Sequence, residues 1–235
     1  MQDIISIRSS YLLVQDPERN EIFRSSIHYC DLMTSISEFS LKDTVDFYKP
    51  EFDKRNIPTR VIYHGTDKLY DPAKNPGFKL PFDNYFVVFG NFYKHKFVPQ
   101  LLEALKSSKH RIIVIGSTSE GAIGNSMYGY KSGNLSDEFI DYVLGNSLGI
   151  IFPSIYEGFG LPFLDGMSYS KKIIVNNTEL NRELRNYFDA FSENVYIFNS
   201  LDEVDGILDK VEADPVIHYK NNDSHIRSWD DSAKE

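Results

Sequence analysis

Short apolar runs from residue 85 onward alternate with segments whose apolar residues recur every three or four positions. The apolar runs cover residues 85–89, 111–116, 148–152, 172–175 and 195–198. Helical patterns occupy residues 97–105, 136–144, 179–187 and 201–211. A continuous apolar run suits a buried strand, and strands alternating with helices predict a parallel, doubly wound sheet. The predicted fold class is therefore α/β with a Rossmann-like sheet.

One strand–loop–helix unit in this region has distinctive loop chemistry. The run at residues 148–152 stops at Pro153, and a helix is predicted from Pro162, whose missing N–H costs nothing in a first turn. The loop between them contains Glu157, Gly158, Phe159 and Gly160. Glycines let the backbone approach a ligand, and the N–H groups of a helix start favour an anion. On loop chemistry alone, a purely structural turn is an equal alternative.

Composition restricts the classes of partner and compartment. The 235 residues suffice for one large domain or one and a half ordinary ones, and the formal net charge is −9. Without a basic excess, a general nucleic-acid binder is excluded, although a small anionic ligand is not. Cys30 is the only cysteine, so there is no internal disulfide or cysteine-built metal site.

The N-terminal residues and the longest apolar runs lack targeting features. Residues 1–8 have no basic start followed by an apolar block, and no run approaches the roughly 20 apolar residues of a membrane span. These features predict a cytoplasmic protein. A stretch rich in proline and glycine at residues 68–81 predicts a linker, so that residues 1–67 and 82–235 form separate parts.

The full string around the glycine loop is much more specific than its loop chemistry. Residues 153–162 read Pro-Ser-Ile-Tyr-Glu-Gly-Phe-Gly-Leu-Pro. This string resembles the signature of the retaining glycosyltransferases of family four, which have the GT-B fold and carry a second acid eight residues after the first. Asp165 stands where that second acid is usually glutamate. The resemblance implies that residues 82–235 form the C-terminal, nucleotide-sugar-binding half of a GT-B fold.

A second segment of the same half resembles another signature of this family. After the strand at residues 85–89, Gly90 and Lys96 match in register, as do Pro99, Leu101, Glu103 and Ala104. His95 replaces an arginine, and Phe97 replaces an asparagine. In place of arginine, His95 serves as a cation or a neutral donor according to its protonation. The resemblance makes Gly90 and His95 candidate donor-binding residues.

The resemblance implies a role for each of these residues. It predicts that Glu157 contacts the donor sugar and that Asp165 contacts the ribose hydroxyls. Aspartate is one methylene shorter than glutamate, so the ribose contact is either looser or completed by water. The main chain predicted to contact the sugar and diphosphate belongs to Gly158, Phe159, Gly160 and Leu161.

Two further side chains are candidates on the same grounds. Lys96 is predicted to stabilise the charge that develops on the diphosphate when the sugar leaves, although lysines at loop–helix junctions are commonly solvated. Leu135 is predicted to border the nucleobase, with apolar core as its alternative role. No Asp-x-Asp pair or metal-ligand spacing occurs, so neither a metal nor a cofactor is predicted.

The N-terminal part resembles only the end of the family's first domain. Residues 30–43 are similar to its "Ser-x-Phe-Ser" segment, and Ser40, with Asp43 three residues on, is predicted to cap a helix. Residues 60–67 are similar to a strand and turn in which His64 takes the usual asparagine position. About 65 residues precede the linker, fewer than a usual GT-B domain holds, so residues 1–67 are predicted to be a partial α/β remnant of the acceptor-side domain.

Two functions follow from the resemblance. The first is transfer of a hexose from a nucleoside-diphosphate sugar to a glycan or lipid-linked acceptor, with retention of configuration, in polysaccharide biosynthesis at the inner membrane face. The second is a non-catalytic nucleotide-sugar-binding module, or one inactive alone because a protein partner must complete the cleft. The chain is expected to be either a fragment of a longer enzyme or a short protein of this kind.

Overall fold

The computed structural model describes residues 4–5, 17–67, 77–91, 93–131, 133, 135–220 and 226–235, so part of the predicted linker, residues 68–76, lies outside it. Contacts divide the chain into two units. Unit 1 comprises Met1–Gly65, Tyr156–Gly160 and Arg227–Glu235. Unit 2 comprises Thr66–Ile155 and Leu161–Ile226. The Tyr156–Gly160 loop therefore belongs to unit 1, although the strand and the helix that flank it belong to unit 2.

Unit 2 contains a seven-stranded sheet within the described residues. Its strands are β3 (Phe86–Phe89), β4 (Ile112–Ser117), β5 (Gly121–Ile123), β6 (Met127–Lys131), β7 (Gly149–Phe152), β8 (Lys172–Asn176) and β9 (Val195–Phe198). Its α-helices are α6 (Val98–Ala104), α7 (Asp137–Gly145), α8 (Leu161–Ser168), α9 (Glu179–Tyr187) and α10 (Val204–Ala213). The 3₁₀ turns fully within its described residues are η2 (Lys94–Lys96), η3 (Asp189–Asn194) and η4 (Leu201–Glu203).

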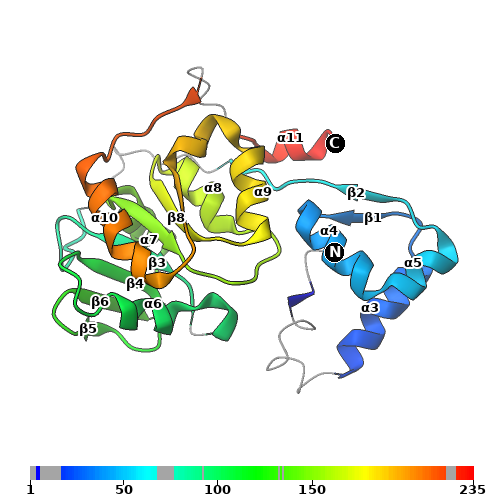
Figure 1. Ribbon diagram of the computed structural model, residues 1–235, viewed down its shortest axis with the longest axis horizontal. Helices are drawn as coiled ribbons and strands as arrows, with labels where there is room; N and C mark the ends of the chain where they lie inside the picture. Colours follow the sequence, from blue (N-terminus) through cyan, green and yellow to red (C-terminus); the bar gives the residue numbers. More distant parts are fainter. Residues whose placement is uncertain are drawn as a thin grey trace. The chain divides into compact units, whose positions relative to one another are not determined.

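The strand order is β5-β6-β4-β3-β7-β8-β9 (Figure 1). Every neighbouring pair is parallel except β5 and β6, which pair antiparallel. The chain builds outward from β3 to β4 and β6, then returns to the other side of β3 with β7 and continues outward to β9. This arrangement confirms the predicted doubly wound, Rossmann-like sheet.

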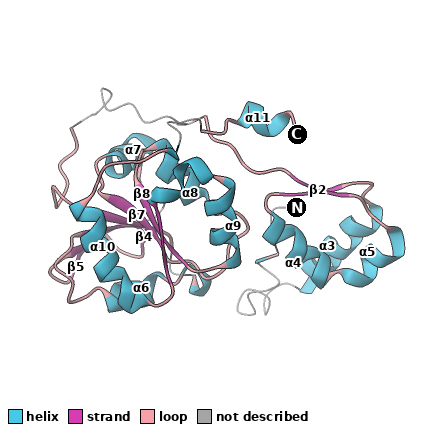
Figure 2. Ribbon diagram, turned by 45° about the horizontal axis from the view of Figure 1, so that its top comes forward, coloured by secondary structure: helices cyan, strands magenta, loops and turns pink. Residues whose placement is uncertain are grey.

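Side chains of the central strands alternate between two buried cores. Phe86 and Val88 of β3 pack into a core with residues of α6 and α10. Tyr85 and Val87 pack into the opposite core with residues of α7. Helices therefore cover both faces of the sheet (Figure 2), as parallel sheets require.

Local signals for helix starts in unit 2 agree with the structure. Ser136 caps α7, where its side chain accepts a hydrogen bond from the backbone N–H of Phe139.

The segment predicted as one helix at residues 201–211 divides into η4 and α10. The β5–β6 hairpin was not predicted, because Met-Tyr-Gly-Tyr-Lys in β6 is neither a continuous apolar run nor a clear alternation.

Unit 1 is a small α/β assembly. Its elements are α3 (Pro17–Tyr29), β1 (Met33–Ser35), α4 (Glu38–Phe47), α5 (Lys49–Arg55), β2 (Thr59–Val61) and α11 (Trp229–Ala233). β1 and β2 pair in parallel, with Met33 opposite Thr59. A separate apolar core includes Ile27, Tyr48 and Phe52.

The caps of unit 1 correct one prediction. Ser37, not Ser40, caps α4, and its side chain accepts a hydrogen bond from the backbone N–H of Ser40. Ser40 lies in the first turn of that helix and is therefore too late in the sequence to cap it. In the part of the chain that the structure describes, no helix is both long enough and apolar enough to cross a membrane.

Candidate functional site

The strand order of unit 2 reverses between β3 and β7. From β3 the chain goes to β4 on one side, and β7 returns on the other side. Gly90 directly follows β3, and Pro153 directly follows β7, so both lie at the carboxyl ends of the two strands at this switch point. Ligands of open α/β sheets bind outside the carboxyl ends of the strands at such a point. The topology thus marks the edge where two of the predicted site segments begin.

Glycines shape the turn after β3. The backbone N–H of Gly90 donates to the carbonyl oxygen of Ile115 at 3.1 Å. Gly90 has a φ of +151°, and Gly116 of β4 has a φ of +102°. A Cβ atom on Gly116 would lie 2.4 Å from the carbonyl oxygen of Gly90. The close approach of the two backbones therefore requires glycine at position 116.

The turn η2 carries two predicted site residues, the donor-binding candidate His95 and the catalytic candidate Lys96. His95 is buried, its ring stacks on Tyr93, and its carbonyl oxygen accepts a hydrogen bond from the backbone N–H of Ile155 at 2.9 Å. The Lys96 amine lies 5.6 Å from the centre of the Phe152 ring. Unit 2 thus brings His95 and Lys96 to the end of β7, where the signature segment begins.

Phe97 adopts a backbone conformation that its residue type disfavours. Its φ is +57°, in the left-handed region, and it immediately precedes α6. Asparagine, which the resembling family has at this position, enters this region much more readily than a bulky residue. Position 97 therefore keeps the left-handed backbone conformation that asparagine adopts readily, although it holds phenylalanine.

The helix α8 is placed close to the sheet by its glycines. Gly160 has a φ of +93° just before the helix, and Pro162 lies in its first turn. A Cβ atom on Gly166 would lie 2.3 Å from Cγ1 of Ile173, so α8 packs directly on β8. Asp165 is half-buried on this helix, whereas Leu161 is exposed.

Ser154 has a hydroxyl that sequence reasoning did not single out. Its side chain is buried at the end of β7, and among the described residues its Oγ has no hydrogen-bond partner. Buried hydroxyls normally find partners, and an unsatisfied one often marks a place where a ligand or water completes the bonding.

The acidic and aromatic part of the signature lies in unit 1. Glu157 is half-buried, whereas Gly158, Phe159 and Gly160 are buried. The Phe159 ring meets the His64 ring edge to face, with 5.0 Å between centres, and His64 also meets Trp229 at 5.1 Å. Burial lowers the pKa of His64 below its ordinary value of 6.5. His64 therefore packs within unit 1 between two aromatic rings.

The predicted site residues are distributed over both units. Unit 2 holds Gly90, His95, Lys96, Leu135, Leu161 and Asp165, and unit 1 holds Glu157, Gly158, Phe159 and Gly160. Leu135 packs against the apolar core that includes Tyr130 and Val143. That placement is the one expected of a core residue.

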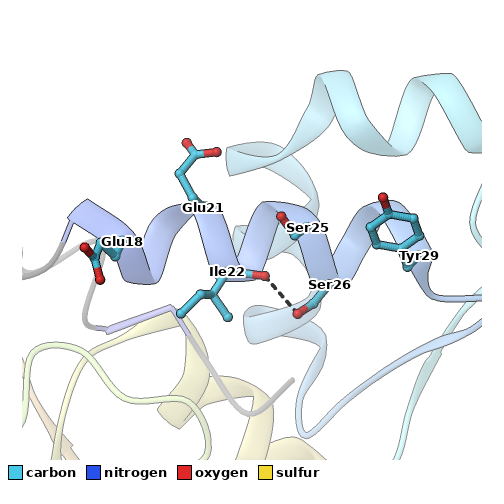
Figure 3. A pocket seen from close by; sticks show the side chains of 6 residues that line it. All are labelled: Glu18, Glu21, Ile22, Ser25, Ser26 and Tyr29. Carbon is cyan, nitrogen blue, oxygen red and sulfur yellow. Dashed lines mark hydrogen bonds between the residues drawn. The ribbon is translucent and has the colours of Figure 1, made fainter.

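Two other features lie apart from these residues. A shallow hollow on α3 is lined by Glu18, Glu21, Ile22, Ser25, Ser26 and Tyr29 (Figure 3). Those residues occupy a single face of one helix, and nothing in the hollow converges on a ligand.

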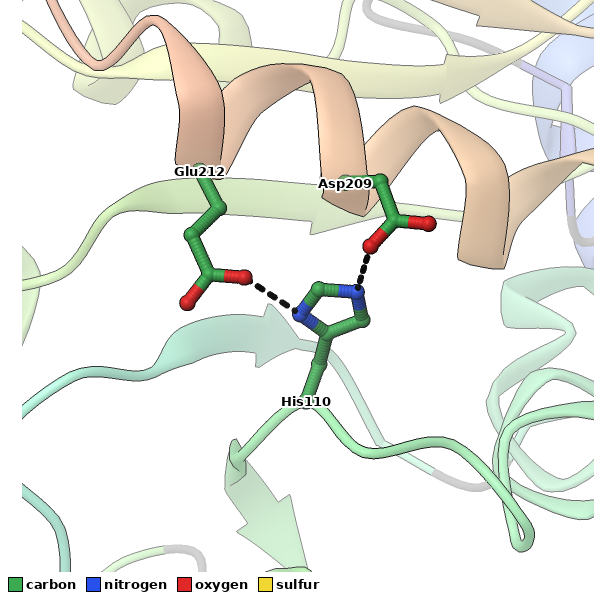
Figure 4. A group of neighbouring side chains, drawn as sticks. All are labelled: His110, Asp209 and Glu212. Carbon is green, nitrogen blue, oxygen red and sulfur yellow. Dashed lines mark hydrogen bonds and ion pairs between the residues drawn. The ribbon is translucent and has the colours of Figure 1, made fainter.

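The second feature is a cluster around His110 that sequence spacing did not predict. Its Nε2 lies 3.2 Å from the Asp209 carboxylate, and its Nδ1 lies 3.3 Å from that of Glu212 (Figure 4). A metal ion can take only one nitrogen of an imidazole, yet here each nitrogen faces a different carboxylate. Lys109 also lies 2.7 Å from Asp209. The cluster is best explained as an ion-pair network that ties α10 to the start of β4.

Comparison with known proteins identifies a matching family. The sequence profile of the family described as glycosyl transferases group 1 matches residues 74–223. No curated protein sequence matches the chain.

Solved structures resemble the chain at low sequence identity. WaaG, a glycosyltransferase involved in lipopolysaccharide biosynthesis, is 13% identical, with a TM-score of 0.55 over 78% of this chain and 54% of that one. A trehalose-6-phosphate synthase is 11% identical, with a TM-score of 0.60 over 87% and 57%. The pneumococcal O-GlcNAc transferase GtfA, solved with UDP and GlcNAc, is 15% identical, with a TM-score of 0.51 over 83% and 39%.

These similarities concern the fold. At such identities they show a Rossmann-like half of the GT-B type. The chain spans about half the length, or less, of the solved structures it resembles.

Proposed function

The chain belongs to the glycosyl transferases of group 1, and on this premise we propose that it binds a nucleoside-diphosphate sugar and transfers the hexose to a glycan or lipid-linked acceptor. The observation that carries the proposal is the switch point between β3 and β7. Gly90 and the signature segment start at the carboxyl ends of these two strands, the place where open α/β sheets bind nucleotides.

Lys96 supplies the positive charge in this proposal. Departure of the sugar leaves additional negative charge on the diphosphate, which a fixed ammonium stabilises most effectively where water is excluded. Main-chain N–H groups from Gly158 to Leu161 and the N-terminal end of α8 add aligned dipoles. Glu157 binds the donor sugar, and Asp165 binds the ribose, directly or through a water molecule.

Net retention and independence from metal are further parts of the proposal. They rest on the close match of residues 153–162 to the signature of the family-four enzymes. With Lys96 and main-chain dipoles meeting the diphosphate charge, turnover is expected to be unchanged by a chelator of divalent metals. The anomeric configuration of the product, read by proton NMR, tests retention.

Titration with a panel of nucleotide sugars tests the donor site. Glu157→Ala and Lys96→Ala are each expected to weaken affinity for the preferred donor about tenfold or more, as loss of a charged hydrogen bond does. Lys94→Ala and Glu120→Ala are matched controls, because both side chains are exposed, and should leave affinity unchanged. Unchanged affinity in both Glu157→Ala and Lys96→Ala contradicts the proposal.

Release of nucleoside diphosphate separates the enzyme from its alternative. Saturable donor binding without release or transfer supports a non-catalytic or partner-dependent module. One of the similar solved structures is a complex, that of GtfA/B, so a partner protein that completes the acceptor side is the second arm of this test. Turnover by the chain alone excludes the non-catalytic and partner-dependent forms.

The proposed donor and acceptor also suggest a location. We place the protein in the cytoplasm, at the inner membrane face when its acceptor is lipid-linked. Its single cysteine, Cys30, fits a reducing compartment. Separating a cell lysate into soluble and membrane fractions measures this directly.

A further inference from the structure

Two buried serine hydroxyls of unit 1 donate to the same carbonyl oxygen in the signature loop. Oγ of Ser37 and Oγ of Ser40 each lie 2.7 Å from the carbonyl oxygen of Gly158. Ser37 is fully buried, and Ser40 is 2% exposed. A carbonyl oxygen has two lone pairs, so the two donors use its full hydrogen-bonding capacity.

The start of α4 places both hydroxyls. Ser37 is the N-cap, and its Oγ accepts a hydrogen bond from the backbone N–H of Ser40 at 3.0 Å. A hydroxyl has one donor hydrogen and separate acceptor lone pairs, so Ser37 caps the helix and donates to Gly158 at the same time. The pair of donors is therefore fixed by the helix itself.

The same helix makes a second set of contacts with the loop. The Phe39 ring meets the Tyr156 ring edge to face, with 5.5 Å between centres. The Tyr156 hydroxyl donates to the Asp43 carboxylate. Phe39 and Asp43 are four residues apart and so lie on one face of α4. Residues of α4 and its N-cap thus contact the loop on both sides of Glu157.

Holding the Gly158 carbonyl also orients the next amide. In a trans peptide the C=O and N–H bonds point in opposite directions, and the described residues contain no cis peptide. The serines therefore direct the N–H of Phe159 away from α4. Gly158 has no side chain to restrict its backbone, so the loop depends on such external contacts for a single conformation.

We propose that Ser37 and Ser40 are positioning residues for the donor: they preset the Gly158–Phe159 peptide, and with it the adjoining Glu157, for binding the nucleotide sugar. The ligand in this inference, a nucleotide sugar, rests on the proposed function. The fixing of the loop by the two serines does not depend on it. A typical hydrogen bond is worth about 1 kcal/mol, so loss of one hydroxyl should lower the ratio of preset to other loop conformations about fivefold.

Amide hydrogen exchange of residues 156–160 tests the hold without any ligand. Ser40→Ala removes one donor and leaves the cap of α4 intact, so exchange in the loop should rise about fivefold, and Ser40→Thr, which restores a hydroxyl, should reverse much of the change. Ser26→Ala is the matched control, because among the described residues that hydroxyl bonds within α3, to the carbonyl of Ile22. Loop exchange equal to wild type in Ser40→Ala, with α4 still protected, overturns the proposal.

If Ser40→Ala does not fold, a second variant tests whether the serine hydroxyls fix the loop. Ser37→Asp keeps an acceptor for the cap but, at neutral pH, has no hydrogen to donate to Gly158. Faster loop exchange in this variant, with α4 protected, supports the hold, and unchanged exchange overturns it.

Steady-state kinetics then separate positioning from general support of the fold. Ser40→Ala should raise the KM for the donor, by at most about fivefold because only the preset fraction of the protein binds, while kcat stays within about twofold. A lower kcat at unchanged KM indicates loss of folded enzyme and overturns the positioning role. If the wild-type protein binds no nucleotide sugar, the proposed function fails, whereas the exchange measurement still decides whether the serines hold the loop.

Discussion

Each of the two units of this protein is stabilised internally by a different kind of interaction. Unit 2 is built around parallel strands whose apolar side chains fill a core on each face of the sheet. Unit 1 joins three segments that are far apart in sequence, through hydrogen bonds from hydroxyl groups to main-chain carbonyls and through edge-to-face aromatic contacts. Ser40 bonds Gly158, and Ser232 bonds Tyr63 at 2.8 Å. The flanks of the signature loop thus depend on hydrophobic burial in the sheet, whereas the loop itself depends on a few directed hydrogen bonds and aromatic contacts.

The largest expected effect concerns the backbone approach in unit 2. Gly116→Ala places a Cβ 2.4 Å from the carbonyl oxygen of Gly90 and forces alanine to a φ of +102°. We expect a loss of roughly 3 kcal/mol in the free energy of unfolding, measured in urea. Gly206→Ala is the control, since no atom lies within 4 Å of its new Cβ, and helix propensity favours alanine there. An equal effect of both changes contradicts the close approach.

A smaller loss is expected from the matching change in unit 1. Gly65→Ala places a Cβ 2.0 Å from the carbonyl oxygen of Ser228, just before α11. We expect it to displace this segment at a cost of roughly 2 kcal/mol and to change the fluorescence of Trp229, the only tryptophan. The far-UV circular dichroism of unit 2 should persist. Loss of both signals together at one denaturant concentration shows that the units unfold as one.

Mild acid should weaken unit 1 selectively. Because burial lowers the pKa of His64, the unfolded chain takes up its proton at a higher pH than the folded chain. The contribution of neutral, buried His64 to the free energy of unfolding is therefore complete above pH 6.5. It declines as the pH falls through the folded-state pKa. His64→Phe keeps a ring against Phe159 and Trp229 and removes the titration. Stability by Trp229 fluorescence from pH 7.5 to 5.5 should fall for wild type and fall less for the variant.

The smallest changes in the free energy of unfolding are expected from replacing either of two buried serines of unit 2 by alanine. Ser147 donates to the carbonyl of Leu144 at 2.8 Å, so Ser147→Ala should cost about 1 kcal/mol. Ser154 has no such partner among the described residues, so Ser154→Ala should be neutral or stabilise slightly. Urea unfolding of both variants measures the difference. A cost for Ser154→Ala as large as that for Ser147→Ala shows that a buried water or main-chain group satisfies its hydroxyl.

Local patterns were enough to predict most of unit 2. The predicted bounds of α9 and β9 coincide with the structure, because each combines a clear periodicity with a clear boundary signal. The helix α5, in contrast, was not predicted, because Lys-Pro-Glu-Phe-Asp-Lys-Arg has no recurring apolar positions. It is a short helix with one buried side chain, Phe52, and its packing rather than its propensity holds it in place.

The site was only partly predictable, for a related reason. The signature segment and Lys96 were recognised because their residue types and spacing are local in sequence. The contact of Ser37 and Ser40 with Gly158 joins positions more than one hundred residues apart. A serine near a helix start has several local partners available, so its residue type alone does not reveal a distant one. The roles of Glu157, Lys96 and Asp165 remain predictions.

The segmented make-up of unit 1 has a consequence for the order of folding. All of unit 2 precedes residue 227, whereas Tyr63 and Gly65 of unit 1 pack with Arg227–Glu235. During synthesis, residues 66–226 can therefore form their sheet while unit 1 still lacks its last piece, Arg227–Glu235. The contacts of unit 1 are also the most distant along the chain, which makes them slow to form. The unit that begins the chain is thus the last to be completed.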